Sequence, residues 1–376
     1  MSKPESLQPK TYKAIGIMSG TSVDGLDIAL CHFTEIDGKW SLEILKTDTL
    51  PYSGTEWNNR LPGAERLSGL ELMEVHRDFG RYTGNSINEF LKDVDIKPDL
   101  IASHGHTVFH QPEKRLTLQI GDGAEIAGIT GITTVSDFRR LDVALGGQGA
   151  PLVPVGDELL FSDFSYCLNL GGFSNISFRV HGKRVAFDIC PVNIVLNLLA
   201  GEKGKAYDHN GDIAREGIIV PELLESMETL DFYRLHGPKS LGKEWVDSVV
   251  LPLLEKSQAP SADKLRTFCE HIALRINAII DNGSLQFGFK NGSGGSNPAP
   301  ALLITGGGAR NGFLTGLISE KTAPVQTIIP EDDLVDFKEA VIFAFLGVLR
   351  LRGEPNCLAS VTGASRDNSG GIIHYC

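Results

Sequence analysis

Apolar and polar positions form short runs along this chain, and the first strong pattern lies near its N-terminus. Residues 15–18 and 26–30 are mostly apolar, and they flank a turn that runs from Ser19 to Gly25. Short apolar runs on either side of Gly, Ser, Thr and Asp residues are typical of a β-hairpin. The pattern therefore predicts a strand, a tight turn and a second strand at the start of the folded chain.

The same pattern returns in the second half of the chain. Residues 165–170 form an apolar run, Gly171 to Asn175 form a turn, residues 176–180 return, and residues 184–187 are a third strand candidate. A further glycine turn, Gly306 to Asn311, follows the apolar residues 301–305 and leads into a helix. A repeated supersecondary unit predicts two related lobes, and we expect their glycine turns to form a nucleotide clamp.

Periodic segments complete the expected elements. Apolar residues at three- and four-residue spacing predict helices over 68–91, with Ser68 as N-cap, and over 245–256, 261–281 and 333–352. We expect the last of these to close the second lobe. Additional strands are predicted at 40–50, 99–103, 116–121 and 132–135, a short helix at 125–129, and a last strand at 370–374 that returns to the first lobe. Residues 282–298, rich in Gly, Ser and Asn, are expected to form an exposed hairpin or a flexible loop.

The run Gly146-Gly-Gln-Gly-Ala-Pro151 is uncharged and poorly suited to the interior of any element. We expect a hinge near Gly146 to Gly149, about which two lobes close on substrate. The chain of 376 residues is too long for one ordinary core, which also favours two domains. The expected division is residues 1–135 plus 356–376 for the first lobe and 136–355 for the second.

Charge and cysteine usage narrow the class of partner. The formal net charge is −12 and the pI about 5.3, which argues against nucleic acid or an anionic membrane surface as partner. Six scattered cysteines without a CxxC pair fit reduced thiols. Residues 1–10 lack the apolar core of a secretory signal, and the longest apolar run, 340–349, is too short to span a membrane. We expect a cytoplasmic protein.

The first turn carries the chemistry of an anion site. A turn with glycines and hydroxyl side chains exposes backbone N–H groups, and a neighbouring carboxylate such as Asp24 suits a metal–phosphate site. An ordinary hairpin turn is the alternative. His104, His106 and His110 invite a zinc hypothesis, but no cysteine or carboxylate lies close in sequence to complete the set, and a bend is expected before His110. Imidazoles that line a polar cleft at the end of a strand are the preferred interpretation.

Asp188 is the best candidate for a catalytic base. It stands at the end of a short apolar strand, where its side chain would emerge into a cleft, and Asn193 offers a second polar group nearby. A helix cap is an equally good interpretation of Asp188 from spacing alone. Cys190 could be a nucleophile, but no histidine lies close in sequence, and a buried thiol is favoured.

The chain resembles the 1,6-anhydro-N-acetylmuramic acid kinases over nearly its whole length. This family belongs to the sugar kinase/heat-shock ATPase/actin superfamily. The opening Gly16-Ile-Met-Ser-Gly-Thr-Ser-Val-Asp-Gly-Leu-Asp27 is similar to the family's ATP-phosphate loop. The other matching motifs are Ser103-His-Gly-His-Thr-Val-Phe-His-Gln-Pro112, Thr117-Leu-Gln-Ile-Gly-Asp122, Asp137-Phe-Arg139, Asp142, Gly146-Gly-Gln-Gly-Ala-Pro-Leu-Val-Pro154, Asn169-Leu-Gly-Gly-Phe-Ser-Asn175, Gly306-Gly-Gly-Ala-Arg-Asn311, Glu339-Ala and Ser360-Val-Thr-Gly-Ala364.

The resemblance implies an α/β fold, a two-lobed actin-like ATPase (ribonuclease H-like) architecture with a central cleft. It implies an enzyme that opens the 1,6-anhydro bond of the sugar with water and phosphorylates O6 with ATP, in cell-wall recycling. Asp188 would take the proton from the attacking water, and Glu339 would help to orient that site. Thr117 and Arg139 fall where the family contacts the sugar, and His104 and Asn193 are expected as further sugar contacts.

The resemblance also implies an ATP site, Mg²⁺ and a homodimer. Asp24 and Asp27 are the expected metal ligands. The expected ATP-binding residues are Gly20, Thr21, Ser22, Val23, Asp24, Gly25, Leu26, Asp27, Gly171, Gly172, Asn175, Gly306, Gly307, Gly308 and Asn311.

Two departures from the family pattern concern substrate fit. The segment Asp188-Ile-Cys-Pro-Val-Asn193 stands where the family usually has Asp-Thr-Gly-Pro-Gly-Asn, and His106 stands where many members have Gln. Two alternatives also stay open at this point. One is a kinase of the same superfamily that acts on a sugar hydroxyl, which Asp188 would deprotonate directly. The other is a non-catalytic, nucleotide-gated sugar sensor.

Overall fold

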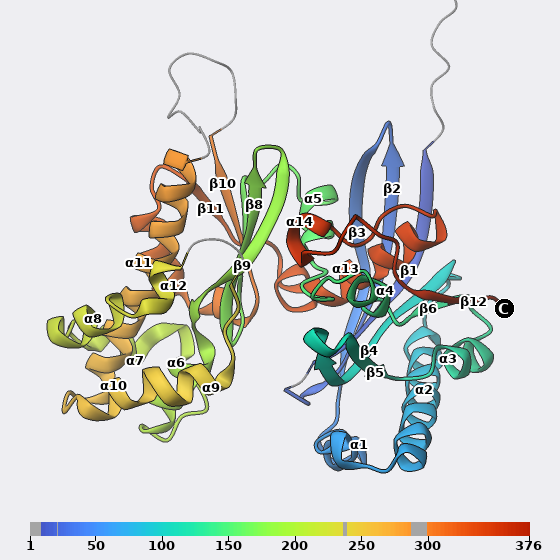
Figure 1. The fold of residues 1–376 in the computed structure, drawn as a ribbon, viewed down its shortest axis with the longest axis horizontal. Coiled ribbons are helices and arrows are strands. Elements are labelled where there is room, and N and C mark those ends of the chain that lie inside the picture. The colour runs from blue at the N-terminus through green and yellow to red at the C-terminus, as the bar shows by residue number, and fades with distance from the viewer. Residues whose placement is uncertain (1–8, 21, 236–238, 287–298) are drawn as a thin grey trace, which may run out of the picture. The chain divides into compact units, whose positions relative to one another are not determined.

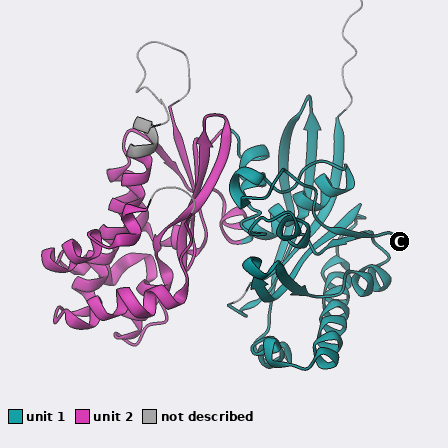
Figure 2. Ribbon diagram, in the orientation of Figure 1, with its two compact units in different colours: residues 1–162, 337–376 teal, residues 163–336 magenta. Residues whose placement is uncertain are grey.

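The computed structural model describes residues 9–20, 22–235, 239–286 and 299–376. These residues form two compact units, residues 1–162 with 337–376 and residues 163–336 (Figure 2). Each unit is a mixed β-sheet with helices (Figure 1), so the predicted α/β class is confirmed. No helix of the described residues is both long enough and apolar enough to cross a membrane.

The elements of unit 1 surround one sheet. Its strands are β1 Lys10–Ser19, β2 Gly25–Ile36, β3 Lys39–Pro51, β4 Leu100–Gln111, β5 Leu116–Ile120, β6 Thr134–Ser136 and β12 Ile372–His374. Its helices are α1 Trp57–Arg60, α2 Gly69–Leu91, α3 Gly123–Thr130, α4 Arg140–Ala144, α5 Pro154–Leu159, α14 Ala359–Thr362 and most of α13 Asp332–Leu351. The strand order is β12-β6-β4-β1-β2-β3, and β5 pairs with β4.

Unit 2 contains the second sheet. Its strands are β7 Tyr166–Leu170, β8 Phe173–Val180, β9 Lys183–Pro191, β10 Ala301–Thr305 and β11 Gln326–Ile328, in the order β11-β10-β7-β8-β9. Its helices are α6 Asn193–Gly201, α7 Asp212–Glu216, α8 Pro221–Glu228, α9 Lys243–Trp245, α10 Leu251–Lys256, α11 Ser261–Gln286 and α12 Gly312–Lys321. A π-helical turn, Val246–Val250, joins α9 to α10.

The two sheets repeat one topology. In unit 1, β3, β2 and β1 are antiparallel neighbours, and β4 and β6 continue the sheet in parallel with β1. In unit 2, β9, β8 and β7 are antiparallel neighbours, and β10 and β11 continue in parallel with β7. The predicted repeat of a strand–turn–strand unit is therefore present, and it extends to five strands in each unit.

Local sequence signals account for several of these elements. Ser68 caps α2 in a capping box, because its hydroxyl accepts from the Glu71 N–H while the Glu71 carboxylate accepts from the Ser68 N–H. The predicted tail strand is β12, which pairs with β6 in unit 1. β4 continues to Gln111, and its pairing with β5 is bulged between Thr107 and Phe109, which is where a bend before His110 was expected. In the predicted loop 282–298, α11 continues to Gln286, and residues 287–298 lie outside the described residues.

Alternate residues of β1 face two different layers. Ile15 and Ile17 pack with Val75 and Phe79 of α2 in one apolar cluster. The opposite face meets α13, where a Cβ on Gly16 would stand 1.7 Å from the carbonyl oxygen of Ala340. The backbones of β1 and α13 are thus in direct contact, which only glycine at position 16 permits.

The division between units differs from the predicted one. The boundaries fall after Ser162 and Asp336, not after residues 135 and 355. The reason is packing, because α13 from Phe337 onward lies on the unit 1 sheet and was expected in the second lobe. Gly146 to Gly149 lie within unit 1, so the chain does not pass between units at the expected hinge.

The chain leaves and re-enters unit 1 at two segments that touch. The Lys338 ammonium lies 2.8 Å from the Asp157 carboxylate, and both side chains are buried. The same ammonium lies 5.4 Å from the centre of the Phe161 ring. Asp157 and Phe161 precede the exit from unit 1, and Lys338 follows the return, so this contact fastens the two segments together.

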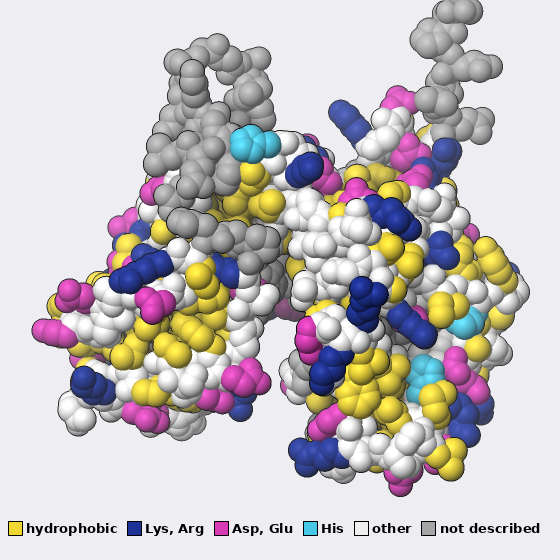
Figure 3. All heavy atoms as spheres, viewed as in Figure 1, with side chains coloured by type: hydrophobic (Ala, Val, Ile, Leu, Met, Phe, Trp, Pro, Cys, Tyr) yellow, Lys and Arg dark blue, Asp and Glu magenta, His cyan; other side chains and the backbone are white. Residues whose placement is uncertain are grey.

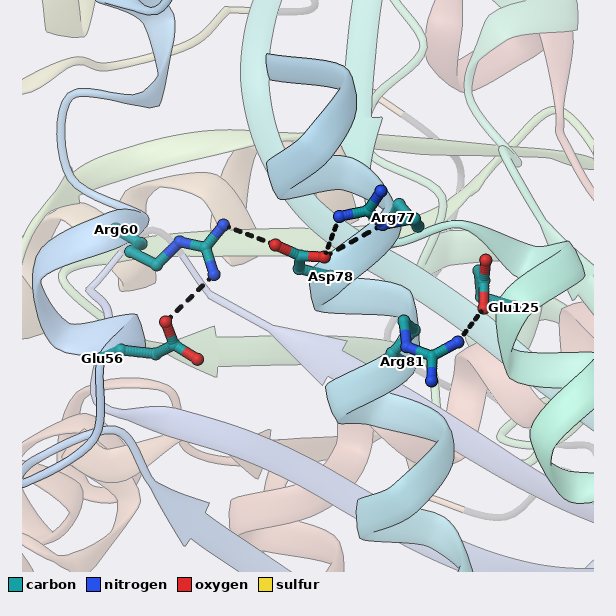
Figure 4. A network of polar contacts seen from close by, with 6 residues as sticks. All are labelled: Glu56, Arg60, Arg77, Asp78, Arg81 and Glu125. Atoms are coloured by element: carbon teal, nitrogen blue, oxygen red, sulfur yellow. Dashed lines mark hydrogen bonds and ion pairs between the residues drawn. The ribbon is translucent and has the colours of Figure 1, made fainter. Parts of the chain in front are cut away.

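Ion pairs connect α1 to α2 and α2 to α3 in unit 1 (Figure 4). Arg60 joins Glu56 to Asp78, and Arg81 joins α2 to α3 through Glu125 at 3.0 Å. Arg77 also contacts Asp78, at 2.7 Å. Because these pairs are partly solvated, each contributes on the order of 0–1 kcal/mol. On the face drawn in Figure 3, Lys and Arg side chains of the described residues lie among Asp and Glu side chains.

Gly16→Ala is expected to destabilise the protein by about 1–3 kcal/mol or more, because the added methyl group overlaps the Ala340 carbonyl and forces α13 away from β1. Urea unfolding of the variant and the parent measures this difference. Gly128→Ala is the matched control, since a Cβ there meets no atom within 4 Å and lies in helix α3. It should stabilise by about 0.5–1 kcal/mol. Equal midpoints for Gly16→Ala and the parent would contradict the close contact.

Candidate functional site

The turn between β1 and β2 is compact and partly open to solvent. The Val23 N–H donates to the Gly20 carbonyl at 3.2 Å, and Val23 has a left-handed φ of 59°. Ser22 and Asp24 are exposed. Gly25 is buried, and a Cβ there would stand 2.8 Å from the Leu50 carbonyl oxygen. Thr21, an expected ATP contact, lies outside the described residues.

A buried chain of hydrogen bonds through Tyr52, Ser19 and His106 lies at the start of this turn. The Tyr52 hydroxyl donates to Ser19 Oγ at 2.8 Å, and Ser19 Oγ lies 3.1 Å from His106 Nδ1. Burial lowers the pKa of His106, which favours the neutral imidazole. His106, which stands where many family members have Gln, thus contacts the side chain of Ser19, the last residue of β1.

Three ionisable residues gather on the α13 side of the unit 1 sheet. Asp27 accepts a hydrogen bond from the Thr49 hydroxyl at 2.7 Å. Burial raises the pKa of Glu339, Arg139 opposes that shift, and the Asp27 charge adds to it. Glu339 is nevertheless exposed by its accessible surface, so the desolvation comes from the crowded protein atoms around its carboxylate and not from enclosure. Unit 1 therefore brings the expected residues Asp27, Arg139 and Glu339 into one electrostatic group.

Arg139 is held in place by His104 and by the glycine run. Its Nε donates to His104 Nε2 at 2.9 Å, and its terminal Nη1 donates to the Gly149 carbonyl at 2.7 Å. His104 donates from Nδ1 to the Gly105 carbonyl, which assigns the tautomer with Nε2 as acceptor. Burial holds the pKa of His104 well below its usual range, and Arg139 adds to this shift.

Thr117 belongs to the same side of unit 1. Its hydroxyl accepts from Gln119 Nε2 at 2.9 Å and lies 3.2 Å from His110 Nδ1. Burial lowers the pKa of His110, and Arg139 lowers it further. The structure therefore groups the expected sugar contacts of unit 1 around neutral imidazoles and one arginine.

Asp142 fixes the glycine run beneath Arg139. Its side chain is fully buried and accepts from the Thr362 hydroxyl at 2.8 Å, the Asn368 amide at 2.9 Å and the Cys357 thiol at 3.0 Å. The Gly149 N–H donates to its second oxygen at 2.8 Å. A carboxylate so fully satisfied is structural, and it sets the position of the Gly149 carbonyl that Arg139 binds.

Asp188 stands at a bulge in β9. The register between β8 and β9 shifts there, so Asn175 faces Asp188 while Ser174 faces Cys190. The Asp188 carboxylate accepts from the Leu241 N–H at 2.8 Å, and its own N–H donates to the Lys239 carbonyl at 3.0 Å. Burial raises the pKa of Asp188, and the Leu241 hydrogen bond opposes that shift.

The alternative interpretation of Asp188 as a helix cap is wrong. The N-cap of α6 is Val192, and no side chain caps that helix. The first N–H groups of α6 donate instead to carbonyls of the β7–β8 turn, from Val192 and Ile194 to Gly172 and from Asn193 to Gly171. The turn that was expected to bind ATP is thereby tied to the start of α6.

Unit 2 also contains a recess of about 590 Å³ beside the third glycine turn. Gly306 has a φ of 82°, and a Cβ on Gly308 would stand 2.7 Å from the Leu170 side chain, so the turn packs tightly on β7. The lining residues are Asn193, Leu196, Asn197, Tyr207, Asp208, His209, Asn210, Gly307, Gly308, Arg310 and Asn311. Asn193, expected at the sugar, lines this recess and donates to the Leu170 carbonyl at 3.2 Å.

Residues 207–210 also line the recess, and the sequence had not indicated a binding role for them. Asn210 accepts from the Gly312 N–H at 3.0 Å, and Asp208 accepts from the Ile213 and Ala214 N–H groups. Tyr207 and His209 present their rings side by side, with centroids 6.4 Å apart. The only sequence signal was a short aromatic and polar cluster between two helices, which is common in loops.

One family model and several curated relatives match nearly the whole chain. A family model described as anhydro-N-acetylmuramic acid kinase matches residues 12–376. A protein of that name from Vibrio cholerae is 35% identical, with 96% of this chain and 98% of that protein covered. Another from Pseudomonas putida is 37% identical, with 93% and 96% covered. Among solved structures, gluconate kinase from Lactobacillus acidophilus aligns over 90% of each chain at 12% identity, with a TM-score of 0.42.

The nucleophile hypothesis for Cys190 leads to a thiol-labelling prediction. Cys190 is buried, its thiol lies 3.2 Å from Ser174 Oγ, and burial raises its pKa to about 12. Cys376 is exposed, whereas the other cysteines are buried. A disulfide reagent should therefore modify one thiol rapidly in the native protein, and Cys376→Ser should remove that reaction. Rapid labelling of Cys190, or loss of turnover in Cys190→Ala with the fold intact, would contradict this assignment.

Proposed function

Because the chain belongs to the anhydro-N-acetylmuramic acid kinase family, we propose that it opens 1,6-anhydro-N-acetylmuramic acid with water and phosphorylates O6 with ATP. The products are N-acetylmuramic acid 6-phosphate and ADP, and the reaction serves cell-wall recycling. The observation that carries the assignment of the base is the Asp188 carboxylate. It is half-buried and accepts a bond from the Leu241 N–H, and burial raises its pKa.

The proposed chemistry divides between water attack and phosphoryl transfer. Asp188 accepts a proton from water as the water oxygen bonds to the anomeric carbon, and the bond from that carbon to O6 breaks. O6 is an ether oxygen in the substrate and carries no proton, so the base is required at the water. The freed O6 then takes the terminal phosphoryl group of ATP, and ADP leaves.

Unit 1 supplies the proposed sugar contacts. Arg139 is the natural partner for an anionic or strongly polar group of the sugar, because its guanidinium is always charged and held in one orientation by His104 and Gly149. Thr117 adds a hydroxyl. The solvent contact of Glu339 and its raised pKa suit a group that orients the reacting site.

The nucleotide is proposed to use the glycine turns. The recess beside Gly307 and Gly308 has the size of a small-molecule site, and the rings of Tyr207 and His209 are available to stack on the adenine of ATP. Mg²⁺ supplies charge neutralisation for the phosphates when bound. Among the described residues no three His, Cys, Asp or Glu are arranged as a metal cage. Mg²⁺ needs none, since one or two carboxylates such as Asp24 and Asp27 suffice beside phosphates and water.

We also propose that the protein is located in the cytoplasm. Its six cysteines are free thiols, which suits the reducing conditions of that compartment. A homodimer is implied by the family resemblance.

An isotope experiment tests the reaction type. With anhydro-N-acetylmuramic acid and ATP in ¹⁸O-labelled water, the product should carry the label at C1. Absence of label would overturn the hydrolytic step and favour a kinase that acts on a sugar hydroxyl.

Asp188→Asn should lower turnover roughly 100- to 10,000-fold while ATP binding, measured by calorimetry, is retained. The variant loses the proton acceptor but keeps an oxygen for the Leu241 N–H. Asp37→Asn is the matched control, because Asp37 is exposed in the β2–β3 turn and Asn tolerates its φ of 53°. Unchanged ADP release in Asp188→Asn would contradict the assignment of Asp188 as the base.

The pH dependence follows from the same carboxylate. The base works only when ionised, and the pKa of Asp188 is raised from the ordinary 3.8 by burial. The value of kcat/KM should therefore fall as the pH is lowered, and the fall should begin above the range of an ordinary aspartate. Steady-state assays across the acidic range measure this limb, with circular dichroism to verify that the protein stays folded. A limb at or below the ordinary range would contradict the raised pKa.

A further inference from the structure

A short segment of unit 2, residues 239–241, covers the backbone of Asp188. We call it the strap. Its Lys239 carbonyl accepts from the Asp188 N–H at 3.0 Å, and its Leu241 N–H donates to the Asp188 carboxylate at 2.8 Å. The strap lies 53 residues further along the chain than the carboxylate that it binds. The orientation of the proposed base therefore depends on what holds the strap.

The side chain of Lys239 fastens the strap to a helical turn. Its ammonium donates to the Phe232 carbonyl at 3.0 Å. It also lies 4.3 Å from the centre of the Phe232 ring and 6.0 Å from that of Tyr233. An ammonium that meets both a carbonyl and aromatic faces is fixed more firmly than either contact alone would allow. The head group is thus turned into unit 2, while its backbone faces Asp188.

The turn that receives Lys239 is itself anchored in a buried polar cluster. The Tyr233 hydroxyl lies 2.9 Å from His271 Nε2, and His271 Nδ1 contacts the Glu228 carboxylate. Arg275 contacts the other oxygen of Glu228, and its guanidinium lies 5.2 Å from the centre of the Tyr233 ring. His271 is 1% exposed. This cluster gives the turn a fixed position relative to α8 and α11.

We propose that Lys239 is a positioning residue for the reaction: by fastening the strap to the Phe232–Tyr233 turn, it keeps the Leu241 N–H on the Asp188 carboxylate. This inference rests on the proposed role of Asp188 as the base. Lys239 acts through the strap and not by contact with the reacting atoms. Its effect is on the orientation and the protonation of the neighbouring carboxylate.

The physical link is a single fixed donor. Burial raises the pKa of Asp188, and the Leu241 N–H counteracts this by favouring the ionised form. The other titratable groups around Lys239 are Arg275 of α11 and the Cys190 thiol of β9, and Glu228 of α8 acts on Cys190. If the strap is released, the donor is lost and the carboxylate stays protonated to a higher pH.

Lys239→Met tests the proposal, since methionine retains an apolar stem over the rings and removes the ammonium. We expect kcat/KM at neutral pH to fall about tenfold, the size of a lost charge-assisted hydrogen bond. The acid limb of the pH profile should move to higher pH, with KM for ATP unchanged. Lys239→Arg should restore both values, because it keeps a cationic donor. Lys243→Met is the matched control, as that lysine is exposed and its ammonium lies 4.0 Å from Asp247.

The outcomes separate this proposal from the proposed function. If Asp188→Asn retains turnover, the role of Asp188 as the base is wrong. If Asp188→Asn is inactive but Lys239→Met keeps the parent's acid limb, Lys239 does not position the base. A purely structural role of Lys239 predicts a lower melting temperature without a shifted limb, and that result would also overturn the proposal.

Discussion

The direct contact between β1 and α13 is the constraint on which the chemistry of unit 1 depends. Because Gly16 has no side chain, the Ala340 carbonyl can approach the strand backbone. Glu339 is the residue before Ala340, so this contact also fixes the backbone position from which the Glu339 side chain extends. Asp27 lies on the neighbouring strand, in register with Met18. The absence of a side chain at Gly16 thus brings Glu339 within electrostatic reach of both Arg139 and Asp27, and it joins the strand that precedes the β1–β2 turn to α13.

The number of donors on a carboxylate separates the structural role of Asp142 from the proposed role of Asp188. Asp142 receives donors on both oxygens, from three side chains and one backbone N–H, and is fully buried. Such a group has no capacity left for a substrate and serves as a structural anchor. Asp188 accepts one bond from the Leu241 N–H and is only half-buried. Among the residues that the structure describes, only the Leu241 N–H is seen to donate to this carboxylate, which suits the proposed role of a base that binds water.

The sequence predicted what local interactions determine. The β1–β2 hairpin depends on its own turn residues, and the start of α2 depends on the capping box of Ser68 and Glu71. The domain boundary was predicted wrongly because the destination of α13 is decided by the contact at Gly16, far away in sequence. The strap on Asp188 and the recess residues 207–210 were missed for the same reason. Their partners are brought together only by the fold.

The contact of Lys338 with Asp157 and Phe161 has an architectural consequence. It joins the last segment before unit 2 to the first segment after it. Unit 2 is therefore a single continuous insertion, residues 163–336, whose two attachment points on unit 1 lie within one side chain's reach. An insertion with adjacent ends leaves the parent sheet's connectivity intact. The two units share one strand order, and β12, which follows the insertion in the chain, extends the unit 1 sheet beside β6.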